Sequence, residues 1–156
     1  MSIDYQFSGS NLASKILPGE RILHIGYDNH LFEGIIPNYI HVDDLESYAQ
    51  SNRAIKFNVA FCLEYINFGS VDIIENQIAI LVSMLREHDT RIYWRCNPGV
   101  QDYIGEQNIF PWTFEEHTRL AEKFKYEISY QDWDDKQRLY VEWSNTKHSL
   151  HYYQSD

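Results

Sequence analysis

Polar side chains that could bind a ligand directly follow a short predicted strand near the start of the chain. The run ILHI at residues 22–25 is apolar and is stopped by Gly26, a pattern typical of a central strand in a parallel sheet. Ligands of open α/β sheets bind at the carboxyl ends of the strands. We therefore expect the polar stretch 27–30, which contains Asp28 and His30, at the mouth of a site.

Two further predicted strands also end on polar side chains. The run YIHV at residues 39–42 is followed by Asp43, and the strongly apolar run 54–63 is followed by Glu64 and Tyr65. Because the carboxyl ends of parallel strands lie at one edge of a sheet, these groups are expected near the loop after Gly26.

The predicted strand over residues 90–96 ends on the same rim with Arg95 and Asn97. A guanidinium group there can hold an acidic ligand, or it can form an ion pair with one of the many acids of the chain. Both alternatives stay open from the sequence.

Alternating strands and helices must position these residues. The clearest helix covers 70–87, where apolar side chains at Ile74, Ile78, Leu81 and Leu85 share one face and Ser70 is the expected N-cap. Thr113 and Glu116 form a capping-box pattern that opens a second helix. Helices are predicted at 12–17, 45–51, 70–87 and 113–124, and strands at 21–26, 39–43, 54–63, 90–96, 126–131 and 138–144.

This order of elements predicts one α/β domain covering residues 1–156. The expected architecture has three layers and is Rossmann-like, with a mostly parallel sheet that carries a C-terminal antiparallel hairpin.

The formal net charge of −10 argues against general binding to nucleic acid, because phosphate contacts need a basic face. A local basic patch stays open. The first residues carry no signal-peptide pattern, and no apolar run is long enough for a membrane span. The sequence therefore predicts a cytoplasmic protein without a membrane partner, of undetermined oligomeric state.

Cysteine and histidine usage offers no metal site. Cys62 and Cys96 fall in apolar runs and are expected to be buried thiols. The seven histidines form no ligand set, since His148 and His151 are only a lone pair in the tail.

Several segments of the chain resemble, in the same order along the sequence, the segments of one enzyme family. The segment FNVAFCLEYINFG, the helix after it and the strand TRIYWRCNPG resemble the second half of class I S-adenosylmethionine-dependent methyltransferases. LPGERILHIG resembles the strand that leads into their glycine-rich cofactor loop, and YIHVDD resembles their second strand. WTFEEHTRLAEKFKYEI resembles their late helix and strand.

The resemblance implies a set of cofactor-binding residues. Asp43 matches the acid that holds the ribose hydroxyls, since a carboxylate accepts two hydrogen bonds. An N-cap role for the helix over 45–51 is the alternative for Asp43. The remaining residues that the resemblance places against the cofactor are His24, Gly26, Tyr27, Asp28, Cys62 and Leu63.

The first loop departs from the family pattern of an acid followed by G-x-G-x-G. His24 occupies the acid position, and only Gly26 of the three glycines is kept. Asp28 and His30 stand at the other two glycine positions. Those glycines let the backbone approach the cofactor, so the loop is degenerate.

The resemblance implies that Glu64 and Tyr65 face the methyl acceptor. Methyl transfer depends on alignment, with a base where the acceptor must lose a proton. Glu64 could be that base, could orient an acceptor, or could be a solvated strand-end carboxylate. The expected function is a methyltransferase whose small-molecule or protein acceptor is unknown, and the alternative is a catalytically inactive binding or structural protein of the same fold.

Overall fold

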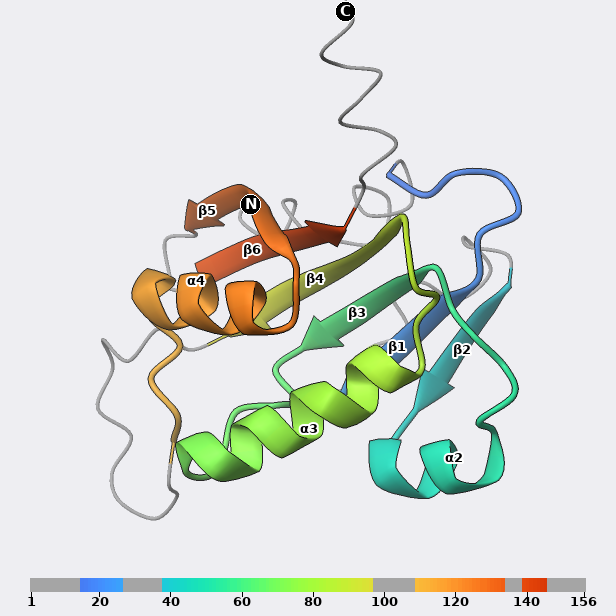
Figure 1. Cartoon of the computed structure of the whole chain (residues 1–156), viewed down its shortest axis with the longest axis horizontal. Coiled ribbons are helices and arrows are strands. Elements are labelled where there is room, and N and C mark those ends of the chain that lie inside the picture. Colours follow the sequence, from blue (N-terminus) through green and yellow to red (C-terminus); the bar gives the residue numbers. More distant parts are fainter. Residues whose placement is uncertain (1–14, 27–37, 97–108, 134–138, 146–156) are drawn as a thin grey trace, which may run out of the picture.

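Six strands form one mixed sheet in the computed structural model, which describes residues 15–26, 38–96, 109–133 and 139–145 (Figure 1). Their order across the sheet is β2-β1-β3-β4-β6-β5. Strands β1 to β4 pair in parallel, and β6 pairs antiparallel with both β4 and β5. The strands are β1 (Ile22–Gly26), β2 (Tyr39–Val42), β3 (Val59–Leu63), β4 (Thr90–Cys96), β5 (Glu127–Trp133) and β6 (Leu139–Asn145). The predicted α/β class, parallel sheet and closing hairpin are confirmed.

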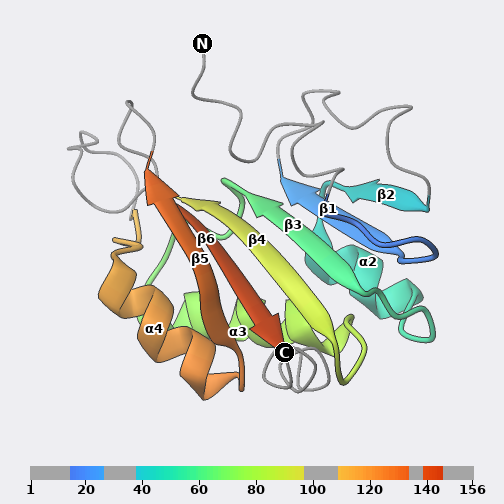
Figure 2. The ribbon, with the colours of Figure 1, turned by 90° about the horizontal axis from the view of Figure 1, so that it is seen from above.

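Three helices in the described part of the chain pack against one face of this sheet (Figure 2). They are α2 (Leu45–Ser51), α3 (Val71–Ser83) and α4 (Phe114–Lys123). Each begins at a side chain that accepts a hydrogen bond from a backbone N–H of the first turn, which satisfies one of the unpaired donors there. These N-caps are Asp44, Ser70 and Thr113.

Strands β1 and β3 are neighbours in the interior of the sheet, and the sequence predicted such a place for β1. All five residues of β3 are buried, because helices cover one face and a second apolar cluster lies on the other. The register pairs Ile22 with Val59 and Gly26 with Leu63. Both strands therefore end at the same level.

Helix α3 is shorter than predicted. The expectation of a helix over 70–87 is wrong at its carboxyl end, because the regular helix stops at Ser83. The backbone N–H of Phe57 donates to the carbonyl of Met84 at 2.9 Å, and the N–H of Arg86 donates to the carbonyl of Phe57 at 2.8 Å. This short parallel bridge replaces the last helical turn.

The helix-side core contains the predicted stripe of α3 and an aromatic cluster. Ile74, Ile78 and Leu81 have no exposed surface, and Leu85 is 5% exposed. The three tryptophans that pack together there are Trp94, Trp112 and Trp143. The opposite face carries a smaller cluster of Ile22, Val59, Phe61, Leu63, Tyr93 and Tyr140.

His117 of α4 is fully buried among these tryptophans. Its ring lies against Trp112, with centroids 4.4 Å apart, and Trp143 Nε1 donates to His117 Nδ1 at 3.2 Å. An indole nitrogen can only donate, so Nδ1 has no proton and the neutral ring carries it on Nε2, 3.7 Å from Cys96 Sγ. Burial lowers the pKa of His117 from 6.5 to about 3.

The helix predicted over 12–17 is wrong at its described end, because residues 15–17 form a turn and irregular backbone ahead of Pro18. Residues 12–14 and most of the hairpin turn lie outside the described residues. No helix in the described part combines the length and apolar character that crossing a bilayer requires.

Candidate functional site

The carboxyl ends of four parallel strands form the edge at which the sequence predicted a site. Gly26 of β1 is in register with Leu63 of β3, and Leu63 is in register with Arg95 of β4. Val42 of β2 is in register with Ile25. The backbone thus brings the ends of β1 to β4 together, as parallel pairing requires.

Gly26 is required by its own backbone conformation. Its φ is +118°, which L side chains rarely adopt, and an added Cβ would lie 2.7 Å from the carbonyl oxygen of Leu63. The close approach of β1 and β3 therefore excludes any other residue here. The Gly26 carbonyl accepts a hydrogen bond from His41 Nε2 at 2.7 Å.

A histidine and tyrosine cluster packs beside the end of β1. His24 is fully buried, and its Nδ1 lies 2.5 Å from the hydroxyl of Tyr39. The rings of His24 and His41 are 4.9 Å apart, because the two residues are register partners on β1 and β2. At the position of the family acid, this chain thus has an imidazole enclosed by aromatic rings, including Phe61.

Asp43 is an exposed acid at the end of β2. Its side chain is 91% exposed, and its Oδ1 lies 3.7 Å from His41 Nδ1. The alternative role as a helix cap belongs to Asp44, whose Oδ1 accepts from the Ser47 N–H at 3.2 Å. The carboxylate of Asp43 is therefore available to a ligand at the end of β2.

Glu64 forms an ion pair that holds it at the end of β3. Its Oε2 lies 3.2 Å from Arg95 Nε, with the two side chains 23% and 35% exposed. The Glu64 N–H also donates to the Arg95 carbonyl at 2.9 Å, and its φ is +67°. Of the two roles left open for Arg95, the ion pair with an acid is the one observed.

The remaining predicted residues of β3 divide between the edge and the core. The Tyr65 hydroxyl accepts from the Leu45 N–H at 3.2 Å, which ties the end of β3 to the start of α2. The Cys62 side chain is buried on the helix side, and desolvation raises the pKa of its thiol to about 12. Leu63 is 6% exposed and faces the opposite cluster. Because both side chains are buried, only the backbone of Cys62 and Leu63 could contact a ligand at the end of β3.

Tyr27 and Asp28 lie outside the described residues, as do Asn29, His30 and Asn97. Within the described ranges, no three His, Cys, Asp or Glu side chains gather in a way that could hold a metal ion.

Sequence reasoning missed His41, which links β2 to the Gly26 carbonyl. The available signal was its alternation with Val42 in the strand YIHV, which places His41 on the face of β2 that His24 shares on β1. His117 was also missed, although it stands three and four residues before Leu120 and Ala121, on the buried face of α4.

The comparisons with known proteins support this reading of the fold. No protein-family model matches the chain, and no curated protein matches its sequence. Solved structures do match. The complex of DhpI with SAH is 13% identical, with a TM-score of 0.58 over 81% of this chain and 76% of that one.

Two further neighbours have the same arrangement. Magnesium protoporphyrin IX methyltransferase (ChlM) from Synechocystis PCC 6803 with bound SAH is 12% identical, with a TM-score of 0.59 over 86% of this chain and 78% of that one. A putative O-methyltransferase from Nostoc punctiforme PCC 73102 is 14% identical, with a TM-score of 0.62 over 86% of this chain and 53% of that one. The resemblance predicted from sequence is confirmed: the chain has the fold of class I methyltransferases.

Proposed function

We propose that the chain is a methyltransferase-type protein that takes S-adenosylmethionine at the carboxyl edge of β1, β2 and β3. One observation carries the proposal. Asp43 stands at the end of β2 with its carboxylate 91% exposed, while Asp44 performs the capping of α2. An exposed carboxylate with no capping role can accept hydrogen bonds from both ribose hydroxyls.

The other residues of the edge have supporting roles in this proposal. Gly26 allows the backbone of β1 to turn beside Leu63, where a side chain would collide. His41 holds the Gly26 carbonyl and lies beside Asp43. His24 fills the space behind them. When bound, S-adenosylmethionine supplies an electrophilic methyl group.

Glu64 and Tyr65 are the groups we assign to the acceptor side. The ion pair with Arg95 fixes the Glu64 carboxylate, which favours orienting an acceptor hydroxyl or amine over moving freely as a base. Tyr65 is held by its hydrogen bond with Leu45. A small molecule or a protein side chain can serve as acceptor.

The sequence of the first loop weakens cofactor binding in this proposal. Asp28 places a carboxylate where the family has glycine, and the cofactor carries a carboxylate of its own. At an effective dielectric constant near 20, two such charges about 4 Å apart repel by about 4 kcal/mol, which is roughly a thousandfold in affinity. We expect weak binding by the natural protein and tighter binding by the Asp28→Gly variant.

The alternative is a catalytically inactive protein of the same fold, and the Glu64–Arg95 ion pair favours it. A carboxylate that is already paired is a poorer proton acceptor than a solvated one. In this case the edge would bind a ligand or a partner without transferring a methyl group.

Calorimetric titration with S-adenosylhomocysteine separates these proposals. We expect Asp28→Gly to bind measurably, and Asp43→Asn in that background to weaken binding about tenfold. Glu46→Gln, which removes an exposed acid of α2, is the matched control and should have little effect. Equal losses from the Asp43 and Glu46 changes would refute the ribose role.

Two further outcomes of the same titration are informative. Submicromolar binding by the natural protein would overturn the expected weakening by Asp28. No binding by Asp28→Gly at millimolar ligand, with the fold intact by circular dichroism, would favour the inactive alternative.

A further inference from the structure

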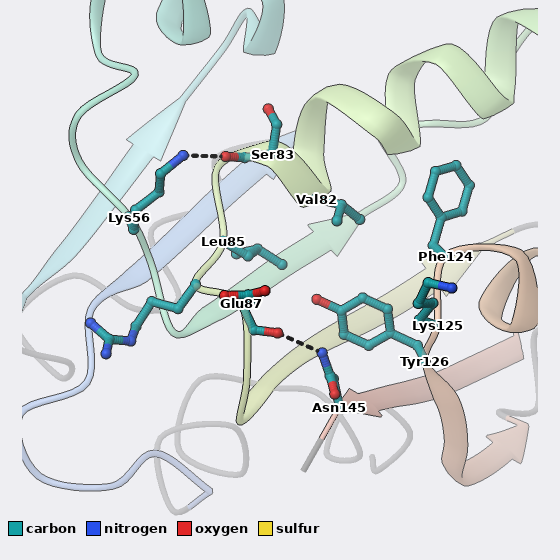
Figure 3. Close-up of a pocket in the computed structure, with 10 residues that line it drawn as sticks. Lys56, Val82, Ser83, Leu85, Glu87, Phe124, Lys125, Tyr126 and Asn145 are labelled. Carbon is teal, nitrogen blue, oxygen red and sulfur yellow. Dashed lines mark hydrogen bonds between the residues drawn. The ribbon is translucent and has the colours of Figure 1, made fainter. Parts of the chain in front are cut away.

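A hollow at the opposite edge of the sheet has no part in the proposed methyltransferase site. It lies at the amino-terminal ends of β3 and β4, between the carboxyl ends of α3 and α4 (Figure 3). Its volume is about 410 Å³, which falls in the usual range for small-molecule sites. We call it the basal groove, and it is lined by Lys56, Val82, Ser83, Leu85, Arg86, Glu87, Phe124, Lys125, Tyr126 and Asn145.

The walls of the basal groove are apolar and partly aromatic. Val82 and Leu85 come from the end of α3 and the residues after it, and Phe124 and Tyr126 come from the segment after α4 (Figure 3). The hydroxyl of Tyr126 is fixed at 2.7 Å from Thr90 Oγ1, so its ring is held in place. Such walls suit a flat ring, because aromatic faces stack on one another.

The rim of the groove is cationic. Lys56, Arg86 and Lys125 line it, against one acid, Glu87. Three cations to one anion reverse the balance of a chain whose net charge is −10. This is a local basic patch of the kind that composition left open.

Two of these three cations are available to a ligand. In the described part of the chain, no hydrogen bond or ion pair is formed by the side chain of Arg86 or Lys125, and both residues are exposed. The third, Lys56, donates to the Ser83 carbonyl at 2.7 Å and has two further N–H groups. Arg86 also borders a second hollow of about 510 Å³, lined by Asn58, Arg86, Glu87, His88 and Asp89.

We propose that the basal groove binds a small aromatic carboxylate, with the ring between the apolar walls and the carboxylate on the cationic rim. The ring gains from burial against Val82, Leu85 and Phe124. The carboxylate gains a charge-assisted hydrogen bond from one cation of the rim, Arg86 or Lys125. Both groups are needed on one ligand, because the net negative charge of the chain opposes binding of a bare anion.

Titration of the full-length chain with 2-naphthoate tests this, with the neutral 2-naphthamide as the paired ligand. We expect 2-naphthoate to bind more tightly. The double change Arg86→Gln with Lys125→Gln removes whichever cation pairs with the carboxylate, so it should weaken 2-naphthoate binding up to about fivefold, as expected for one partly exposed ion pair, and should leave 2-naphthamide unchanged.

The matched control removes two cations from the same edge of the sheet but outside the groove. Arg21 and Arg53 are exposed and do not line it, so Arg21→Gln with Arg53→Gln should leave 2-naphthoate binding unchanged. Equal binding of the two ligands, equal effects of the two double variants, or no binding of 2-naphthoate would overturn the proposal. In the Asp28→Gly variant, saturation with S-adenosylhomocysteine should not displace 2-naphthoate, and displacement would place the ligand at the other edge and refute the basal site.

Discussion

The buried histidine of α4 should make the stability of this protein depend on pH in a way that one substitution removes. His117 is fully buried, and its Nδ1 accepts from Trp143. Protonation would place an N–H against the indole N–H and a charge among tryptophan rings. The folded state therefore resists the protonation that the unfolded chain undergoes at its ordinary pKa of 6.5.

The sign of the effect follows from this difference in proton binding. Since the pKa of His117 is lowered to about 3 in the folded state, the unfolded state binds more protons between pH 6.5 and 3. The contribution of His117 to the free energy of unfolding is fully present above pH 6.5 and is lost progressively as the pH is lowered from 6.5 to 3. At 1.36 kcal/mol per pH unit, the loss from this residue reaches about 2.7 kcal/mol at pH 4.5.

Urea unfolding at several pH values measures this loss. The His117→Gln variant keeps a hydrogen-bond acceptor for Trp143 and cannot titrate. Its free energy of unfolding should be lower than that of the natural protein at pH 7.5, and the difference should shrink by about 2.7 kcal/mol by pH 4.5. Carboxylates titrate in both proteins, so they cancel in the difference.

An exposed histidine provides the control. His88→Gln, which replaces an exposed histidine, is the control variant for the same measurement. Parallel stability curves for the natural protein and His117→Gln between pH 7.5 and 4.5 would refute the reasoning.

Three further predictions concern stability and thiol chemistry. Leu81→Ala, at a position with no exposed surface, should cost about 2–5 kcal/mol in urea unfolding, whereas Val71→Ala on the exposed side of the same helix should cost less than about 0.5 kcal/mol. Cys62 and Cys96 should react with Ellman's reagent only at the rate of unfolding, because both are buried; rapid reaction in native buffer would contradict this. Lys125→Gly should raise thermal stability by about 1 kcal/mol, since Lys125 has a φ of +68° after the end of α4, and a lower melting temperature would count against it.

Much of the fold could be predicted because local signals and tertiary packing agree. Gly26 marks the end of β1, and Ser70 and Thr113 mark the starts of α3 and α4. The end of α3 could not be predicted from its apolar stripe. Leu85 continues the helical spacing, yet it pairs with Phe57 in a short bridge, and only the tertiary structure reveals that partner.

The candidate site was predictable in location and less so in its contacts. The sheet edge at which the site lies can be predicted from the parallel strands alone, because ligands bind at their carboxyl ends. The choice between Asp43 and Asp44 as helix cap depends on backbone geometry that adjacent aspartates do not reveal. The pairing of Glu64 with Arg95 depends on the register of β3 against β4, which a single sequence leaves undetermined.

The position of β6 has a consequence for how this chain is made. β6 follows every other strand in sequence, yet it lies between β4 and β5. The roughly 40 residues between Cys96 and Leu139 take about 2–8 s to synthesise. During that time the backbone groups of β4 that later pair with β6 have no neighbouring strand. The nascent chain therefore exposes a sheet edge that can pair with other chains until β6, with Val141 and Trp143, is added beside β4.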